Sequence, residues 1–183
     1  MISRDEAIQL LHTYAKDDHD LLWKSYAVEH ILILLSKELD EDEKVWGLTG
    51  LLYDLDYEYT SKNPENHTLI TANIVVGLVP DDAIEAIKSH NYLYTGSIPT
   101  SFLSKALLAS DAAINLILRL SKNKPLKKIT KKELISSYKD TSFDKYYQKE
   151  WLLLCSDLNM KIPDFLYFCL KSLKEITQML QNI

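Results

Sequence analysis

The amino-acid sequence predicts an all-α fold, on the basis of three observations. The chain of 183 residues has only four glycines and five prolines, so the residues that most often interrupt helices are scarce. Apolar residues recur mostly at spacings of three and four, which is the period of a helix and not of a strand. Capping-box patterns that mark helix starts occur at Ser3 with Glu6, Asp40 with Glu43, and Thr130 with Glu133. We therefore expect helices and no sheet.

The expected helices follow these signals in chain order. A helix over 4–16 follows the Ser3 capping box, 20–39 contains the apolar run from Ile31 to Leu35, and 41–53 follows the Asp40 capping box. Pro64 and Pro80 suit the first turns of helices over 64–78 and 80–90. A long apolar pattern predicts a helix over 100–120, and the Thr130 capping box predicts one over 131–139. The same apolar spacing predicts two final helices, over 142–158 and 163–181.

A lysine-rich segment from Ser121 to Lys132, interrupted by Pro125, separates the last helices from the rest. Such a segment is typical of a solvated loop, and it also suits a phosphate-attracting patch near the mouth of a pocket, so both interpretations stay open. The length of the chain is that of one domain. We expect a single domain over 1–183, with a core over about 1–120 and a helical extension over about 130–183 that packs on it.

Composition indicates an ordinary globular protein and argues against several partner classes. Hydrophobic residues make up 46% of the chain and charged residues 26%. The net charge of −5 disfavours general nucleic-acid binding. No apolar stretch approaches the roughly 20 residues that cross a bilayer, and the first residues lack the pattern of a signal peptide. We expect a cytoplasmic protein that does not bind membranes, with Cys155 and Cys169 as reduced core residues.

Four residues on or beside different expected helices are candidates for a shared site: Asp54, His67, His90 and Asp111. Carboxylate oxygen and imidazole nitrogen together suit manganese, iron or zinc, and a water bound to such a metal is a competent nucleophile toward phosphorus. The same residues are also compatible with hydrogen-bonded histidines and paired aspartates in a helical core. The spacing alone leaves both alternatives open.

Several segments that include these residues resemble the HD-domain phosphohydrolase superfamily, and they are Trp23–Glu29, Gly47–Glu58, Ser89–Asn91 and Ala109–Asp111. The resemblance extends over almost the whole chain and is closest to small stand-alone members. It implies an HD-domain helical bundle with a C-terminal helical extension. It also implies metal-dependent phosphohydrolysis as the usual activity of the superfamily.

The resemblance further implies a site of four metal ligands, which are a first-helix histidine, a His-Asp doublet and a later aspartate. Here Lys24 stands at the first histidine position and Tyr53 at the doublet histidine, while Asp54 and Asp111 match the two aspartates. In members that bind two metals, two further histidines hold the second ion. These positions match His67 and His90, so a reduced site of Asp54, His67 and His90 is an alternative.

Lys24 is expected to face Asp54 and Asp111 and to supply positive charge where a metal ion is lost. An ammonium group does not lower the pKa of a bound water as a metal does, so this substitution predicts impaired hydrolysis. We therefore take Asp54, Asp111, Lys24 and Tyr53 as the candidate catalytic positions. Candidate substrate-binding residues just after His90 are Asn91, Tyr94 and Thr95, for which a loop with helix caps is the alternative.

Three functional hypotheses follow. The first is an inactive or impaired HD-type protein that binds a phosphorylated small molecule. The second is an active phosphohydrolase with a single divalent transition metal on Asp54, His67 and His90. The third is a structural or partner-binding domain. The cofactor is accordingly either none or one manganese, iron or zinc ion, and the sequence does not fix the substrate or the oligomeric state.

Overall fold

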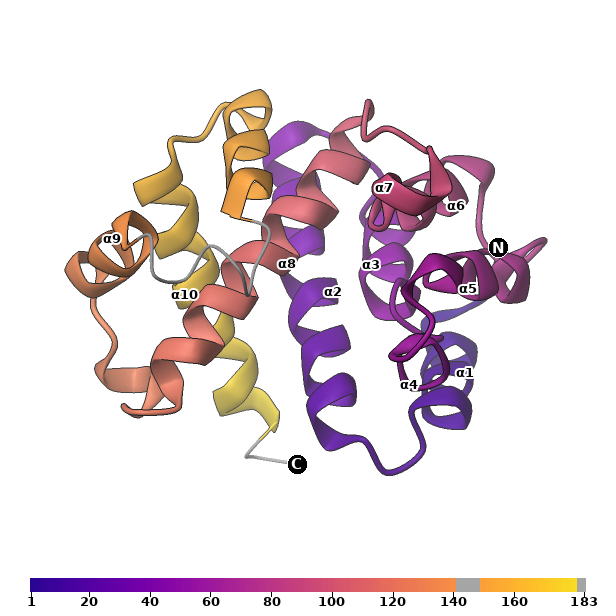
Figure 1. Cartoon of the computed structure of the whole chain (residues 1–183), viewed down its shortest axis with the longest axis horizontal. Helices are drawn as coiled ribbons and strands as arrows, with labels where there is room; N and C mark the ends of the chain where they lie inside the picture. The colour runs from indigo at the N-terminus through magenta and orange to yellow at the C-terminus, as the bar shows by residue number, and fades with distance from the viewer. Residues whose placement is uncertain (141–148, 181–183) are drawn as a thin grey trace.

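The computed structural model describes residues 1–140 and 149–180, and every regular element in them is a helix (Figure 1). The predicted all-α class is thus confirmed. None of the helices in these two stretches has both the length and the hydropathy needed to cross a bilayer. The elements in chain order are α1 (Arg4–Ala15), α2 (His19–Leu39), α3 (Glu43–Leu52), α4 (Tyr57–Thr60), η1 (Pro64–Asn66), α5 (Leu69–Val75), α6 (Asp81–Ser89), α7 (Tyr92–Thr95), α8 (Phe102–Ser121), η2 (Leu126–Lys128), α9 (Lys131–Lys139), η4 (Lys149–Leu158) and α10 (Ile162–Leu180).

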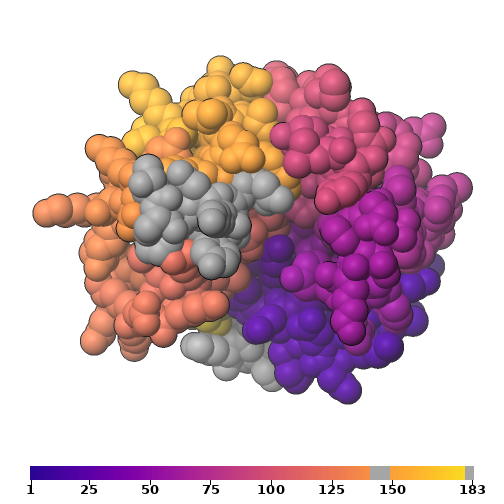
Figure 2. Space-filling model, viewed as in Figure 1, coloured from indigo at the N-terminus to yellow at the C-terminus, as the bar shows by residue number. Residues whose placement is uncertain are grey.

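Helices α2 and α8 form the centre of the bundle. Helix α2 packs against α3 and α8, and α8 also packs against α6 and η4. Figure 1 shows α1 and α3 to α7 on one side of this centre, with α9, η4 and α10 on the other. The same division is visible on the surface in Figure 2, where the orange and yellow C-terminal part lies opposite the indigo and magenta N-terminal part. Helix α10 contacts both α2 and α8, so the C-terminal elements pack directly on the central pair.

Two of the three predicted capping boxes are confirmed. In both, the Ser3 and Thr130 side chains accept a hydrogen bond from the backbone three residues on, and the glutamate at that position accepts one from the cap residue in return. The prediction for Asp40 was wrong. Asp40 ends α2 in the left-handed region at φ 57°, and Asp42 caps α3 by accepting from the backbone of Lys44 at 2.8 Å. The helix therefore begins at Glu43.

The helix expected over 64–78 is broken, because its backbone is held by side chains from other segments. His67 is extended and Thr68 is left-handed at φ 69°, between η1 and α5. The Asn91 side-chain amide donates to the carbonyl groups of Pro64 at 2.7 Å and His67 at 2.9 Å. These bonds replace helical ones and keep His67 directed toward the interior of the bundle.

The helix expected over 142–158 is described only from Lys149, and 142–148 lies outside the described residues. From Lys149 to Leu158 the chain is a 3₁₀-helix, where an α-helix was expected. Leu152, Cys155 and Leu158 are buried at intervals of three residues. Because a 3₁₀-helix has three residues per turn, this spacing aligns them on one face against α8.

Close approach of α2 and α3 sets the position of the site. A Cβ atom added at Gly50 would lie 2.8 Å from the backbone nitrogen of Glu29 and 2.9 Å from the carbonyl carbon of Val28. Only glycine allows the two backbones to come this close. Since Asp54 follows α3 and Lys24 lies on α2, this contact brings the two side chains together.

Candidate functional site

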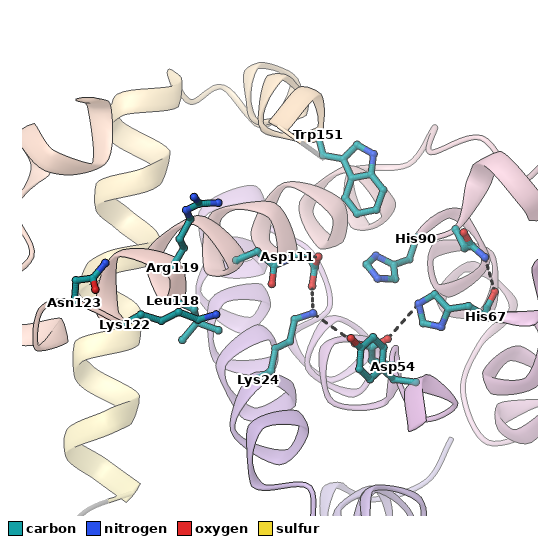
Figure 3. Close-up of a pocket in the computed structure, with 13 residues that line it drawn as sticks. Lys24, Asp54, His67, His90, Asp111, Leu118, Arg119, Lys122, Asn123 and Trp151 are labelled. Atoms are coloured by element: carbon teal, nitrogen blue, oxygen red, sulfur yellow. Dashed lines mark hydrogen bonds and ion pairs between the residues drawn. The ribbon is translucent and has the colours of Figure 1, made fainter. Parts of the chain in front are cut away.

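A cavity of about 890 Å³ lies where α2, the end of α3, α8 and η4 meet (Figure 3). We call its buried part the inner end, defined by Lys24, Asp54, His67, His90 and Asp111. Its more exposed part is the outer end, defined by Leu118, Arg119, Lys122 and Asn123 at the end of α8. A second cavity of about 720 Å³ adjoins it on the α2 side, is also lined by Asp18 and Asp20, and shares Lys24 and Lys122 with it.

Lys24 lies between two buried carboxylates at the inner end. Its ammonium nitrogen is 2.7 Å from Asp111 Oδ1 and 3.5 Å from Asp54 Oδ2, so the pairing expected from the sequence is present. The Lys24 side chain is 19% exposed, and those of Asp54 and Asp111 are 2% and 3% exposed. Burial by itself lowers the pKa of Lys24, but the charges of Asp111 and Asp54 outweigh it and raise the pKa well above its usual value. The lysine is therefore a fixed cation.

Both oxygens of Asp111 already have partners. Besides Lys24, its Oδ1 accepts a hydrogen bond from the Tyr53 hydroxyl at 2.9 Å, and its Oδ2 accepts one from the Asn115 side-chain amide at 2.8 Å. Burial alone would raise the pKa of Asp111, but Lys24 reverses this and the pKa is lowered. Burial and the neighbouring Asp111 raise the pKa of Tyr53 well above its ordinary value. Tyr53 is thus a neutral hydrogen-bond donor and not an anionic ligand.

His67 bridges two aspartates. Its Nδ1 is 2.7 Å from Asp56 Oδ1, and its Nε2 is 3.3 Å from Asp54 Oδ1. Burial lowers the pKa of His67, but the hydrogen bond to Asp56 and the charge of Asp54 outweigh this effect and raise it. If Nδ1 donates its proton to Asp56, the Nε2 atom either carries a second proton that pairs with Asp54 or is a bare nitrogen that can accept a hydrogen bond or bind a cation.

His90 is enclosed by aromatic rings. It makes edge-to-face contacts with Tyr53 at 5.0 Å, His67 at 5.5 Å and Trp151 at 5.3 Å between ring centroids. Burial lowers the pKa of His90, so the ring is neutral near pH 7. Within the described residues its Nδ1 atom is buried without a hydrogen-bond partner. One further hydrogen bond or coordinate bond is therefore open to it.

Three of the four expected metal-binding residues fit a divalent transition metal. Asp54, His67 and His90 each offer a ligand atom, and these atoms lie within 4.8 Å of one another. Asp54 Oδ1, like His90 Nδ1, is buried and makes no hydrogen bond within the described part of the chain. Asp56 is placed to orient His67 from behind, as carboxylates commonly do for metal-bound histidines. The fourth expected residue, Asp111, does not join this group because Lys24, Tyr53 and Asn115 occupy its oxygens.

The structure separates the three residues expected to form a substrate-binding wall. Asn91 lines the cavity, but its amide hydrogens are used by the carbonyl groups of Pro64 and His67. Thr95 donates to the carbonyl group of Lys88 at 2.9 Å, and Tyr94 is 56% exposed. Neither Tyr94 nor Thr95 lines the cavity. Asn91 thus positions His67, and the other two lie outside the cavity lining.

Several residues of the cavity were not identified from the sequence. Asn115 and Arg119 follow Asp111 at intervals of four, and this spacing on one helix face was the available signal. Trp151 comes from a distant segment, and no local pattern points to it. Within the lysine-rich segment, Lys122 is the lysine that lines the cavity. Others are used in ion pairs, such as Lys124 with Glu133 at 2.6 Å.

Comparison of the chain with models of protein families, with curated proteins and with solved structures finds no match in any of the three. The likeness to HD-domain proteins is therefore an expectation from sequence motifs. Function has to be inferred from the geometry and charge of the site.

Proposed function

We propose that this protein binds a phosphorylated small molecule in the cavity and has lost metal-dependent phosphohydrolysis at the four-ligand site of HD-domain proteins. The observation that carries the proposal is the position of Lys24, 2.7 Å from Asp111 and 3.5 Å from Asp54. A lysine ammonium balances the charge of the two carboxylates, which otherwise repel each other. It does not activate a water molecule as a nucleophile.

Tyr53 supports the same conclusion. Its hydroxyl donates to the Asp111 oxygen that Lys24 also contacts, so both replacements for the ligand histidines bind one carboxylate. Lys24 and Tyr53 thus form a network of ion pairs and hydrogen bonds with Asp111 at the inner end. Networks in which every member has a partner stabilise one arrangement of the core.

The outer end of the cavity favours an anionic ligand. Arg119 and Lys122 line it from the last turn of α8 and the residue that follows. Arginine and lysine are the residues that most often bind phosphate groups. A volume of about 890 Å³ falls within the range of small-molecule sites, which favours ligand binding over a purely structural role.

A second candidate function is a phosphohydrolase with one divalent metal on Asp54, His67 and His90. It is favoured by the convergence of these ligand atoms within 4.8 Å and by two buried atoms, Asp54 Oδ1 and His90 Nδ1, that make no hydrogen bond within the described residues. A bound metal ion would supply an activated water. In that case Asp54, His67 and His90 hold the ion, Asp56 orients His67, and the outer end holds the phosphate of the substrate.

Metal analysis separates the two candidates. The protein is purified without a chelating column, and its metal content is measured before and after incubation with manganese, iron or zinc. Hydrolysis of p-nitrophenyl phosphate and bis-p-nitrophenyl phosphate is assayed in parallel. The proposed function predicts no turnover in any condition and binding of glucose 6-phosphate by calorimetry that weakens in Lys122→Ala. Turnover that depends on an added metal and is lost when His67→Ala and His90→Ala are combined would establish the second function instead.

A further inference from the structure

A group of exposed apolar side chains lies between α7 and the first turn of α8. Among the described residues twelve large apolar side chains are exposed, and four of these fall within ten consecutive positions. They are Leu93 at 76%, Tyr94 at 56%, Ile98 at 71% and Phe102 at 45% exposure, and we call them the apolar patch. Single exposed apolar side chains are normal, whereas a group of them marks a surface that another molecule covers.

The backbone around the apolar patch is held in place at both ends. Helix α7 is a single turn that ends at Gly96, in the left-handed region at φ 72°. The Thr95 hydroxyl donates to the carbonyl group of Lys88 at 2.9 Å and accepts from the backbone of Ser97 at 3.2 Å, and the Ser101 side chain caps α8. Successive members of the patch are at most four residues apart, so no more than about 14 Å of extended chain separates them. Figure 2 shows the rose-coloured part of the chain near residue 100 at the surface.

The apolar patch lies in the longest uncharged stretch of the sequence. The sixteen residues from Ser89 to Ser104 include no Asp, Glu, Lys or Arg, although these types make up 26% of the chain. At the border of the stretch the Ser97 hydroxyl lies 2.9 Å from the Glu85 carboxylate, which is paired with Lys88 at 2.7 Å, so these two charges offset each other. An apolar, aromatic centre without charge and a polar border are characteristic of protein–protein interfaces.

We propose that the apolar patch is the contact surface of a two-fold symmetric dimer of this chain. The chain has a net charge of −5, so two copies repel each other unless uncharged surfaces meet. In a two-fold symmetric dimer the same surface lies on both subunits. The contact then places an uncharged stretch against its own copy and buries eight large apolar side chains, four from each subunit.

Other partners fit the apolar patch less well. A strongly charged partner finds no complementary charge in it. A bilayer would be held by the apolar side chains alone, because Lys88 at the border is already paired with Glu85, and stable attachment to a membrane takes two signals. The four patch residues line neither of the two cavities described above, so they do not form a groove there for a helix or a peptide. A second copy requires neither a charge nor a groove.

The dimer contact lies beside the candidate site but is separate from it. His90 and Asn91, which line the cavity, directly precede α7, and Phe102 begins the helix that carries Asp111. None of the patch residues belongs to the cavity lining. The inference is therefore independent of the proposed function.

Analytical ultracentrifugation of the wild-type protein, from about 1 to 100 μM, tests the inference. We expect a species of twice the 21.1 kDa of one chain, with a share that grows with concentration. Because the contact is apolar, raising sodium chloride from about 0.1 to 1 M should not weaken the dimer. A wild-type protein that is monomeric over the whole range overturns the inference, and so does a dimer that dissociates in high salt.

Two double variants locate the contact. Leu93→Ser with Ile98→Ser should weaken dimerisation at least about tenfold. The matched control is Val76→Ser with Leu153→Ser, which changes apolar side chains of similar exposure, 63% and 57%, outside the patch and should leave the dimer intact. All four side chains are exposed in the single chain, so both variants should fold, as circular dichroism checks. A dimer that persists in the patch variant, or that is lost equally in the control, assigns the contact to another surface and overturns the inference. Binding of a monomeric wild-type protein to phosphatidylcholine vesicles, lost in the patch variant, overturns it in favour of a membrane.

Discussion

The Lys24 ammonium nitrogen lies 2.7 Å from Asp111 Oδ1, the oxygen that also accepts the hydrogen bond of the Tyr53 hydroxyl. The two residues that the expected HD-type resemblance places at histidine positions therefore contact one atom. A change at one of them alters the surroundings of the other, so their effects on stability and on metal binding should not be additive.

Replacement of Lys24 by alanine should destabilise the protein by about 3 kcal/mol, because it leaves two buried carboxylates without their cation. The matched control is Lys122→Ala at the exposed outer end, for which we expect a loss below about 0.5 kcal/mol. Urea denaturation at pH 7 measures both. A Lys24→Ala loss below about 0.5 kcal/mol would show that the ion pairs contribute no more than surface pairs do.

The ion pair of Lys24 with Asp111 predicts that stability depends on pH in the acid range. The pKa of Asp111 is lowered in the folded protein from its ordinary 3.8, so its contribution to stability is present above that pH and is lost as the pH falls. The difference in stability between wild type and Lys24→Ala should therefore narrow below about pH 4. A difference that stays constant through this range would contradict the assigned pair.

The double variant Lys24→His and Tyr53→His should bind manganese or zinc more tightly than either single variant, by more than the sum of their separate effects. The double change removes both partners of Asp111 Oδ1 and adds two imidazole ligands. In the single variants, Asp111 Oδ1 keeps one of these two partners. Titration calorimetry on wild type and the three variants measures this. A folded double variant that binds no better than wild type would show that positions 24 and 53 do not face a metal site.

The pKa values of the two site histidines should be shifted in opposite directions from the ordinary value. His67, whose pKa is raised above 6.5, contributes stability that is fully present below pH 6.5 and is lost as the pH rises through the folded pKa. His90, whose pKa is lowered by burial, stays neutral when folded. The unfolded chain therefore gains a proton below pH 6.5 that the folded protein does not, and stability falls with decreasing pH. Nuclear magnetic resonance of the imidazole groups, assigned with His67→Asn and His90→Asn, should give the higher midpoint for His67. The reverse order would contradict the described contacts.

Gly50→Ala should cost about 2–3 kcal/mol, whereas Gly47→Ala should stay within about 1 kcal/mol of wild type. The new Cβ at position 50 would lie 2.8 Å from the α2 backbone at Glu29, which cannot move alone. At position 47 it would lie 3.0 Å from the Ile33 side chain, which has freedom to shift. Thermal denaturation of the two variants tests the difference. Equal losses would show that the α2–α3 approach is not limited by backbone contact.

The helices that could be predicted from the sequence are those whose apolar spacing lies within a single helix. Apolar spacing predicted α2, α8 and α10 to within a few residues, because each has an apolar face that must be buried. The prediction failed over 64–78, where Asn91 from a later segment holds the carbonyl groups of Pro64 and His67. Such contacts depend on tertiary structure, and no local propensity contains them.

The candidate site could likewise be predicted from the sequence only in part. The motif pointed to Lys24, Asp54 and Asp111, which the structure brings into contact. It did not point to Asn115, whose hydrogen bond closes the second oxygen of Asp111. This partner competes with a metal ion for Asp111. Residue identities alone therefore do not predict which of the candidate residues can bind a metal.

The winding of η4 determines how far its polypeptide reaches. A 3₁₀-helix rises about 2.0 Å per residue and an α-helix about 1.5 Å, so the ten residues from Lys149 to Leu158 span roughly 5 Å more than the same residues would in α-helical form. Trp151 lies near one end of this segment, against His90, and Leu158 is anchored in the core at the other. A change to α-helical winding would shorten the segment and separate the indole from the imidazole. The 3₁₀ winding of this segment thus contributes to the position of Trp151 in the cavity lining.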